Sequence, residues 1–252
     1  MRMMLQSSLQ AFAKQVSDGN PMFNPFKGSV QDTGLLNLNI VLNNTLSYNR
    51  YSTSWGIDLT NLRSSVKSLL TYGTETAQVQ EWTLKGRVNV WKAWTIELVQ
   101  KTSAINLYTP SFKNRNYAIN AISTEPRITY TAGTLFRVQA GYQYTSKENE
   151  ERYGGETARF STINLEGKYN TFSNTSLTGR FTYSDIRFTG EPNSTVSYIM
   201  LEALQPGKNY IWNLDLTKRF INSLELSFEY EGRKPASGNT INIGRVSLRV
   251  LL

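Results

Sequence analysis

Three carboxylates in one segment are the residues with the best spacing for chemistry. Glu225, Glu229 and Glu231 are separated by even numbers of residues, so a β-strand would place them on one face. Neighbouring carboxylates can act as general acid and base or bind calcium. The favoured interpretation is structural: a charged wall balanced by Arg245 and Arg249 on the following segment, because ion-pair networks commonly serve structure.

Other kinds of active site lack their residues. The chain has no cysteine and no histidine, which excludes a Ser-His-Asp triad, a cysteine nucleophile and the common zinc sites. The Gly154-Gly155 pair has no strand-to-helix context and predicts a turn rather than a phosphate-binding loop. We therefore expect a protein that is not an enzyme and that has no catalytic, cofactor or metal site.

Composition narrows the fold class. The chain has 252 residues, of which 39% are hydrophobic and 12% aromatic, and no apolar run reaches the ~18 residues of a membrane-spanning helix. The net charge is +8, but Lys and Arg are scattered singly, so we expect no nucleic-acid partner.

Alternation of apolar and polar residues predicts β-strands from residue 35 onward. It is regular where Trp82, Leu84, Val88 and Val90 oppose Lys85 and Arg87. Strands are expected at 35–48, 54–62, 77–91, 94–105, 117–130, 135–146, 158–171, 175–188, 209–219, 223–232 and 240–251. The alternation slips near Asp185 and Gly244, where we expect β-bulges.

The N-terminal region has a different pattern. Leu5, Leu9, Phe12 and Val16 lie at helical spacing before Gly19, which predicts a short amphipathic helix over 4–16 that packs on the protein body. Residues 20–33 predict an irregular connector. The expected domains are thus an N-terminal helix and connector at 1–33 and a β-barrel domain at 34–252.

Strand length and turn pattern favour an antiparallel transmembrane β-barrel over a soluble sheet. Several strands have the ~9 to 11 residues that cross a bilayer when tilted. Tight turns at Lys92-Ala93, Ala132-Gly133, Ser173-Asn174 and Ile221-Asn222 alternate with longer loops at 62–76, 105–116, 146–157, 189–208 and 233–239. Outer-membrane barrels have this asymmetry between periplasmic turns and extracellular loops.

Aromatic and charged residues fit the same arrangement. We expect a membrane-interface girdle beside the tight turns, formed by Trp91, Trp94, Tyr130, Phe136, Phe172 and Phe220, with ordinary strand-end packing as the alternative. We expect the following charged side chains to face a wet lumen: Lys85, Arg87, Glu97, Arg137, Glu166, Lys168, Arg180, Asp215, Glu225, Glu229, Arg245 and Arg249.

The strand count leaves closure of the barrel open. Eleven strands after residue 34 conflict with the even number usual in bacterial barrels. Either the N-terminal segment contains a twelfth strand, or further strands come from a longer parent chain or another chain. No export signal is visible, so we expect a C-terminal part of a longer protein.

Four segments resemble a known group of proteins. They are 20–28 (NPMFNPFKG), 69–75 (LLTYGTE), 200–212 (MLEALQPGKNYIW) and 230–235 (YEGRKP). They are similar to the C-terminal β-barrel region of large Bacteroidota outer-membrane proteins. The resemblance implies a longer parent, a periplasm-to-surface topology and partner subunits in a surface or type 9 secretion assembly. A chain ending in Leu252 departs from the aromatic end common in such barrels.

Three functions follow as hypotheses. The favoured one is a non-enzymatic barrel in the bacterial outer membrane that anchors or forms part of a surface or transport assembly. The alternatives are a diffusion porin and a soluble β-rich module that binds nucleic acid or polysaccharide. Expected partners are outer-membrane lipid and lipopolysaccharide. The basic loop residues could meet lipopolysaccharide phosphates, but ordinary solvated loop charge is the favoured interpretation of Lys113, Arg115, Arg152, Arg233 and Lys234.

Overall fold

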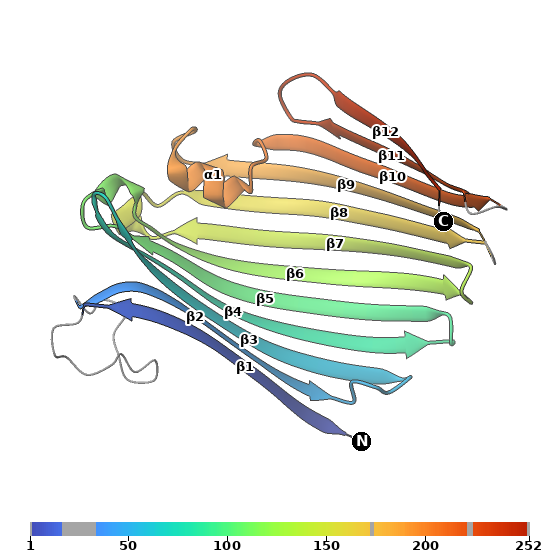
Figure 1. Ribbon diagram of the computed structural model, residues 1–252, viewed down its shortest axis with the longest axis horizontal. Helices are drawn as coiled ribbons and strands as arrows, with labels where there is room; N and C mark the ends of the chain where they lie inside the picture. The colour runs from blue at the N-terminus through green and yellow to red at the C-terminus, as the bar shows by residue number, and fades with distance from the viewer. Residues whose placement is uncertain (1, 17–33, 172–173, 221–223, 251–252) are drawn as a thin grey trace.

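The chain forms one antiparallel sheet of twelve strands, seen in a computed structural model that describes residues 2–16, 34–171, 174–220 and 224–250 (Figure 1). The strands are β1 Met3–Gln15, β2 Leu35–Tyr48, β3 Trp55–Leu70, β4 Gly73–Val90, β5 Trp94–Tyr108, β6 Tyr117–Ala132, β7 Phe136–Asn149, β8 Thr157–Asn170, β9 Thr175–Thr189, β10 Gly207–Phe220, β11 Leu224–Lys234 and β12 Ile241–Val250. The expected all-β antiparallel fold is confirmed.

Every strand pairs with its neighbours in sequence, in the order β1 to β12. The sheet curves into a trough, and Figure 1 shows β1 and β12 along its two borders. Among the described residues, no ladder joins β1 to β12. The outer edges of these two strands therefore have no strand partner within the described sheet.

The predicted N-terminal helix is wrong, because residues 3–15 form β1 along its whole length beside β2. Leu5 and Leu9 are four residues apart, which places them on one face of a helix and equally on one face of a strand. Pairing with β2 decides between the two, since an isolated helix of this length is marginal in water. β1 is the twelfth strand that an even count required, whereas Gly19 and the predicted connector lie outside the described residues.

Two further expectations about strands are wrong. Residues 62–76 are not a long loop, because β3 and β4 extend through this region and leave only residues 71 and 72 between them. No bulge occurs at Asp185 or Gly244, where the ladders keep one register. The ladder shift in the described strands lies between Lys14 and Gln15.

The two ends of the sheet differ in their connections. β1 begins and β12 ends at one end (Figure 1), where the turns include 91–93 and 133–135. The opposite end has the loops 109–116, 150–156 and 190–206, together with the two-residue turn between β3 and β4. We call these the short-turn end and the long-loop end. The expected separation of short and long connections is present, apart from the 62–76 segment.

A small apolar core lies at the long-loop end. The 190–206 loop contains α1 (Thr195–Leu201), which Ser194 caps by accepting a hydrogen bond from the Ser197 backbone amide. Buried side chains of α1 and of three strands pack together there: Tyr117, Ile119, Ala158, Phe160, Ile186, Val196, Met200 and Leu201. The core therefore holds a loop against the sheet and leaves most of the trough open.

Candidate functional site

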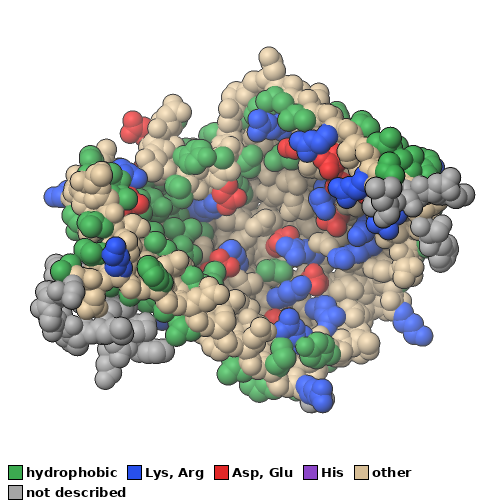
Figure 2. All heavy atoms as spheres, in the orientation of Figure 1, with side chains coloured by type: hydrophobic (Ala, Val, Ile, Leu, Met, Phe, Trp, Pro, Cys, Tyr) green, Lys and Arg blue, Asp and Glu red, His purple; other side chains and the backbone are tan. Residues whose placement is uncertain are grey.

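The concave face of the trough is polar and charged. Figure 2 looks onto this hollowed face, where Lys, Arg, Asp and Glu side chains gather. The ladder register places every charge that we expected in a lumen on this one face: Lys85, Arg87, Glu97, Arg137, Glu166, Lys168, Arg180, Asp215, Glu225, Glu229, Arg245 and Arg249. We call this face the charged trough.

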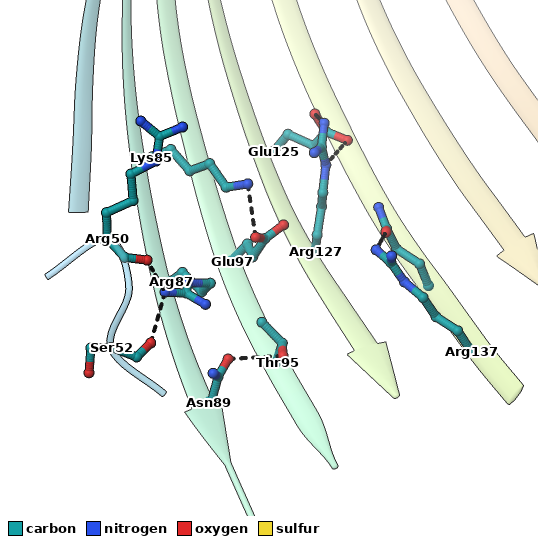
Figure 3. Close-up of polar contacts among 11 residues, drawn as sticks. Arg50, Ser52, Lys85, Arg87, Asn89, Thr95, Glu97, Glu125, Arg127 and Arg137 are labelled. Atoms are coloured by element: carbon teal, nitrogen blue, oxygen red, sulfur yellow. Dashed lines mark hydrogen bonds and ion pairs between the residues drawn. The ribbon is translucent and has the colours of Figure 1, made fainter. Parts of the chain in front are cut away.

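Ion pairs run across neighbouring strands near the short-turn end (Figure 3). Lys85 Nζ on β4 lies 2.9 Å from Glu97 Oε1 on β5. On β6, the Arg127 guanidinium donates two hydrogen bonds, of 2.7 and 2.6 Å, to the two carboxylate oxygens of Glu125. Such two-point pairing is the strongest geometry available to these groups, and within the wall each charge is compensated by the other.

Arg87 binds backbone rather than a carboxylate. Its Nη2 donates to the carbonyl oxygens of Arg50 and Ser52, each at 3.1 Å (Figure 3). These carbonyls belong to the loop between β2 and β3. Arg87 therefore fastens that loop to the wall of the trough.

The C-terminal half of the trough has a similar network. Arg180 on β9 bridges two carboxylates, with Nε 3.4 Å from Glu166 Oε2 and Nη1 3.5 Å from Asp215 Oδ2. Arg245 Nη1 lies 3.0 Å from Glu229 Oε2, as expected for a balanced charged wall.

One detail of that wall differs from the sequence interpretation. Glu225 has a ladder partner on each side, Arg219 on β10 and Arg249 on β12, and its carboxylate pairs with Arg219 at 2.8 Å. Glu231 lies on the same face as Glu225 and Glu229, as the spacing predicted. In the part of the chain that the structure describes, no group of three acidic residues could hold a metal ion.

α1 lies over the trough at the long-loop end and is fastened by a buried lysine. Lys147 on β7 is 9% exposed, and its Nζ donates to the Met200 carbonyl oxygen at 2.9 Å and to Glu202 Oε1 at 2.6 Å. The same ammonium lies 4.8 Å from the centre of the Phe160 ring. A cation so buried is stable only when paired, so this contact fixes the position of the 190–206 loop.

A cavity of about 170 Å³ lies beneath α1. Its polar wall includes Ser123, whose Oγ accepts hydrogen bonds from Gln143 Nε2 at 3.0 Å and from Thr145 Oγ1 at 2.8 Å. Lys101 on β5 and Glu81 on β4 pair at 2.7 Å within the same wall. The space under α1 is therefore small and has mixed walls, in which Ile105, Ile119 and Met200 lie beside the polar side chains.

The convex face of the sheet is apolar and exposed. Its side chains include Leu84 and Leu98, which are 47% and 52% exposed, and similar residues on almost every strand. Examples are Ile57, Leu59, Val88, Ile96, Ile122, Ile128, Ile163, Leu165, Leu214, Val246 and Leu248. A continuous exposed apolar surface of this extent is exceptional in a soluble monomer. We call it the apolar belt.

Aromatic side chains border the belt at both ends. At the short-turn end Trp94 packs on Tyr130 with ring centres 4.9 Å apart, and Tyr48 packs on Trp55 at 5.4 Å. At the long-loop end Tyr210 contacts Phe181 and Tyr183, at 6.5 and 5.1 Å. The first border contains the aromatics expected beside the tight turns, and the second was not predicted.

The remaining expected girdle residues can be placed one by one. Trp91 is 85% exposed in the turn between β4 and β5, where it has a positive φ of 50°. Phe136 begins β7, and Phe220 ends β10 with the Lys218 ammonium 5.2 Å from its ring centre. Phe172 lies outside the described residues.

Two of the five basic residues expected in loops, Arg115 and Arg152, have partners in the protein, and Arg233 and Lys234 lie at the end of strand β11. Arg115 donates from Nη1 to the Tyr72 hydroxyl at 3.0 Å and lies 3.3 Å from Glu75. These contacts, the hydrogen bond first, raise the pKa of the Arg115 guanidinium. Arg152 pairs with Glu150 at 2.5 Å. The contacts tie neighbouring loops together and reduce the charge free to meet an external phosphate.

The comparisons with known proteins come from structure alone. No protein-family model and no curated protein matches the chain. Among solved structures, the porin NanC aligns with a TM-score of 0.39 and 8% identity, over 84% of this chain and 94% of the porin. The ferric yersiniabactin uptake receptor FyuA from Yersinia pestis aligns with a TM-score of 0.44 and 11% identity, over 91% of this chain.

The chain spans about half the length of that receptor, since the alignment covers 50% of it. Both likenesses are distant. No helix among the described residues is long and apolar enough to cross a membrane.

Proposed function

We propose that this chain forms the wall of a non-enzymatic transmembrane β-barrel in a bacterial outer membrane. The observation that carries the proposal is the partition between the two faces of one sheet, with the charged trough on one side and the apolar belt on the other. A soluble sheet places its apolar face against a core and its charges in water. Here the apolar face is the outer, convex one, which suits contact with lipid.

The height of the belt supports the same conclusion. Tyr210 and Phe220 mark its two borders on β10 and lie ten positions apart on the same strand. At ~3.4 Å per residue and a tilt of about 40°, this separation corresponds to about 26 Å across the membrane. The apolar band of outer-membrane barrels is about 25 Å tall.

The charged trough is suited to a water-filled interior. Its ion pairs join neighbouring strands and would lose solvation in lipid at a cost of several kcal/mol per ion. Under α1 the interior narrows to the small cavity beside Lys147. We infer a conduit that is restricted at the long-loop end, which favours a role in anchoring or in assisted transport over free diffusion.

We further propose that the chain is a component of a larger surface or transport assembly. The outer edges of β1 and β12, which have no strand partner within the described sheet, support this, because lipid cannot satisfy unpaired backbone amides and carbonyls. Additional strands beside β1 and β12, from a longer chain or another subunit, would satisfy them. The sequence resemblance to large Bacteroidota outer-membrane proteins, including those of type 9 secretion, points in the same direction.

Spin labels test directly whether the apolar belt faces lipid and the charged trough faces water. Labels at Leu84, Val138 and Leu214 should be accessible to oxygen dissolved in the bilayer and shielded from a water-soluble nickel reagent. Matched labels at Lys85, Gln139 and Asp215, each on the opposite face, should show the reverse. Water accessibility at all six sites, or release of the protein without detergent, would rule out the membrane barrel.

The porin alternative has one observation in its favour, since most of the trough is polar and open. Conductance in planar bilayers separates the two functions. A stable open channel supports a porin, whereas a silent or rarely conducting barrel supports the anchor or restricted conduit.

A further inference from the structure

A second set of cations lies outside the trough. Arg159, Arg187, Lys208 and Lys234 occupy four consecutive strands, β8 to β11, one on each strand. All four are exposed, and the ladder register places them on the convex face with the apolar belt. We call them the outer basic row.

The row lies at the long-loop border of the belt. Lys234 is the ladder partner of Tyr210, and Lys208 lies two residues before Tyr210 on the same strand and face. The rings of Tyr183 and Tyr210 are in contact, so aromatic side chains lie directly beside the cations. In a membrane this is the level at which hydrocarbon gives way to headgroups.

The charges of the row are not neutralised by the protein. Within the described residues, none of the four forms an ion pair or a side-chain hydrogen bond, whereas Lys85, Arg180 and Arg245 in the trough each pair with a carboxylate. Arg159 and Arg187 are direct ladder partners, an arrangement that destabilises a sheet unless an anion lies between them. Two carboxylates share this face with the row: Asp185 is the ladder partner of Lys208 and lies two residues from Arg187, and Glu148 lies on β7 next to β8. Neither forms an ion pair with a cation of the row within the described residues.

We propose that the outer basic row binds lipid phosphate groups of the outer leaflet, as found on lipopolysaccharide. Guanidinium groups bind phosphate through two parallel hydrogen bonds, and adjacent strands about 4.8 Å apart let two side chains share one phosphate. The proposal rests on the proposed membrane location, and it adds a lipid class, a leaflet and a sector of the wall. A shared phosphate would also explain why Arg159 and Arg187, which carry the same charge, are ladder partners.

The sequence contains a matched control for this site. Arg137 and Lys168 are likewise ladder partners of equal charge on β7 and β8, but they lie on the concave face at the short-turn end. The double variant R159Q/R187Q therefore removes the same charge from the same kind of position as R137Q/K168Q. Only the first pair meets lipid headgroups if the proposal holds.

The test measures lipid retained by the detergent-solubilised protein, by native mass spectrometry, with bisphosphorylated lipid A and its dephosphorylated form as probes. The unaltered chain should retain the phosphorylated form preferentially. R159Q/R187Q should lower that retention about tenfold, whereas R137Q/K168Q should leave it unchanged. Equal loss in both variants, no loss in R159Q/R187Q, or full displacement of lipid by an equal concentration of inorganic phosphate would overturn the proposal.

Failure of the lipid-phosphate proposal can be told apart from failure of the proposed membrane location. Insertion of the unaltered chain into vesicles is measured in parallel by co-flotation. Insertion without phosphate preference defeats the outer basic row alone, and absence of insertion defeats the barrel itself. A folding defect in R159Q/R187Q would appear as lost resistance of the barrel to proteolysis, and the single variant R187Q then repeats the comparison.

Discussion

Single residues set how closely the strands and their side chains can pack on the convex face. Gly232 on β11 is the ladder partner of Trp212 on β10, and the indole ring lies over it. A Cβ built on Gly232 would come within 2.1 to 2.3 Å of three ring atoms. This glycine is therefore required by a close approach rather than by its backbone angles.

We expect Gly232→Ala to displace the Trp212 ring and to lower the free energy of unfolding by about 1 to 3 kcal/mol, the usual cost of overpacking. Tryptophan fluorescence and denaturant unfolding measure the two effects. Gly167→Ala is the control, because a Cβ at Gly167 meets nothing within 4 Å. Equal losses in the two variants would show that the ring contact is unimportant.

Buried Lys147 differs from the exposed basic residues because it holds the 190–206 loop in place. We expect Lys147→Met to leave the Met200 carbonyl oxygen without its donor and to cost about 1.5 to 3 kcal/mol of loop attachment. Limited proteolysis within residues 190–206 should then become faster. Glu202→Gln is the milder control, because Lys147 keeps its contact with the Met200 carbonyl; similar cleavage in both variants would argue that the carbonyl contact contributes little.

At the scale of elements, the side-chain alternation of a strand decides which substitutions a barrel tolerates. Leu84 and Lys85 are adjacent on β4 and face opposite sides of the sheet. Leu84→Arg should block assembly, because a cation at the bilayer midplane costs ~2 to 4 kcal/mol. Lys85→Gln should be tolerated despite loss of the Glu97 ion pair. Folding yield, measured as the protease-resistant fraction in vesicles, distinguishes them, and equal yields would contradict the assigned faces.

The strands were predictable from sequence where one face forms the apolar belt. Alternation identified β4 to β11 because apolar and polar residues separate cleanly within the belt. It failed at the ends of β3 and β4, where Arg63 and Lys67 share the convex face with Ser65 and no apolar surface is required. The apparent slip at Asp185 has the same cause, since the strand continues beyond the belt with its register unchanged.

The trough charges were placed on one face by the same period-two rule, but their partners were not predictable. Whether Glu225 pairs with Arg219 or Arg249 depends on side-chain conformation, which the alternation does not contain. α1 was missed because a seven-residue helix has little intrinsic stability and is held by Lys147 and the small core. The second aromatic border became visible only when the register aligned Tyr183 with Tyr210.

At the scale of the whole molecule, the position of α1 over the trough should limit the conductance of the barrel. We expect the chain reconstituted in planar bilayers to conduct little, and Lys147→Met to increase the open time by releasing α1 from the trough. Glu202→Gln again provides the comparison. A large steady conductance in the unaltered chain, insensitive to Lys147→Met, would favour the diffusion porin over the restricted conduit.

The nearest-neighbour order of the strands makes the wall modular. Within the described sheet, each strand forms ladders only with the strands before and after it in sequence, so β4 and β5 can be excised without breaking a ladder between distant strands. Removing β4 and β5 together would bring β3 beside β6 in the correct antiparallel direction and narrow the wall by about 9.6 Å, two strand spacings. Evolution can thus widen or narrow such a pore by duplicating or losing hairpins.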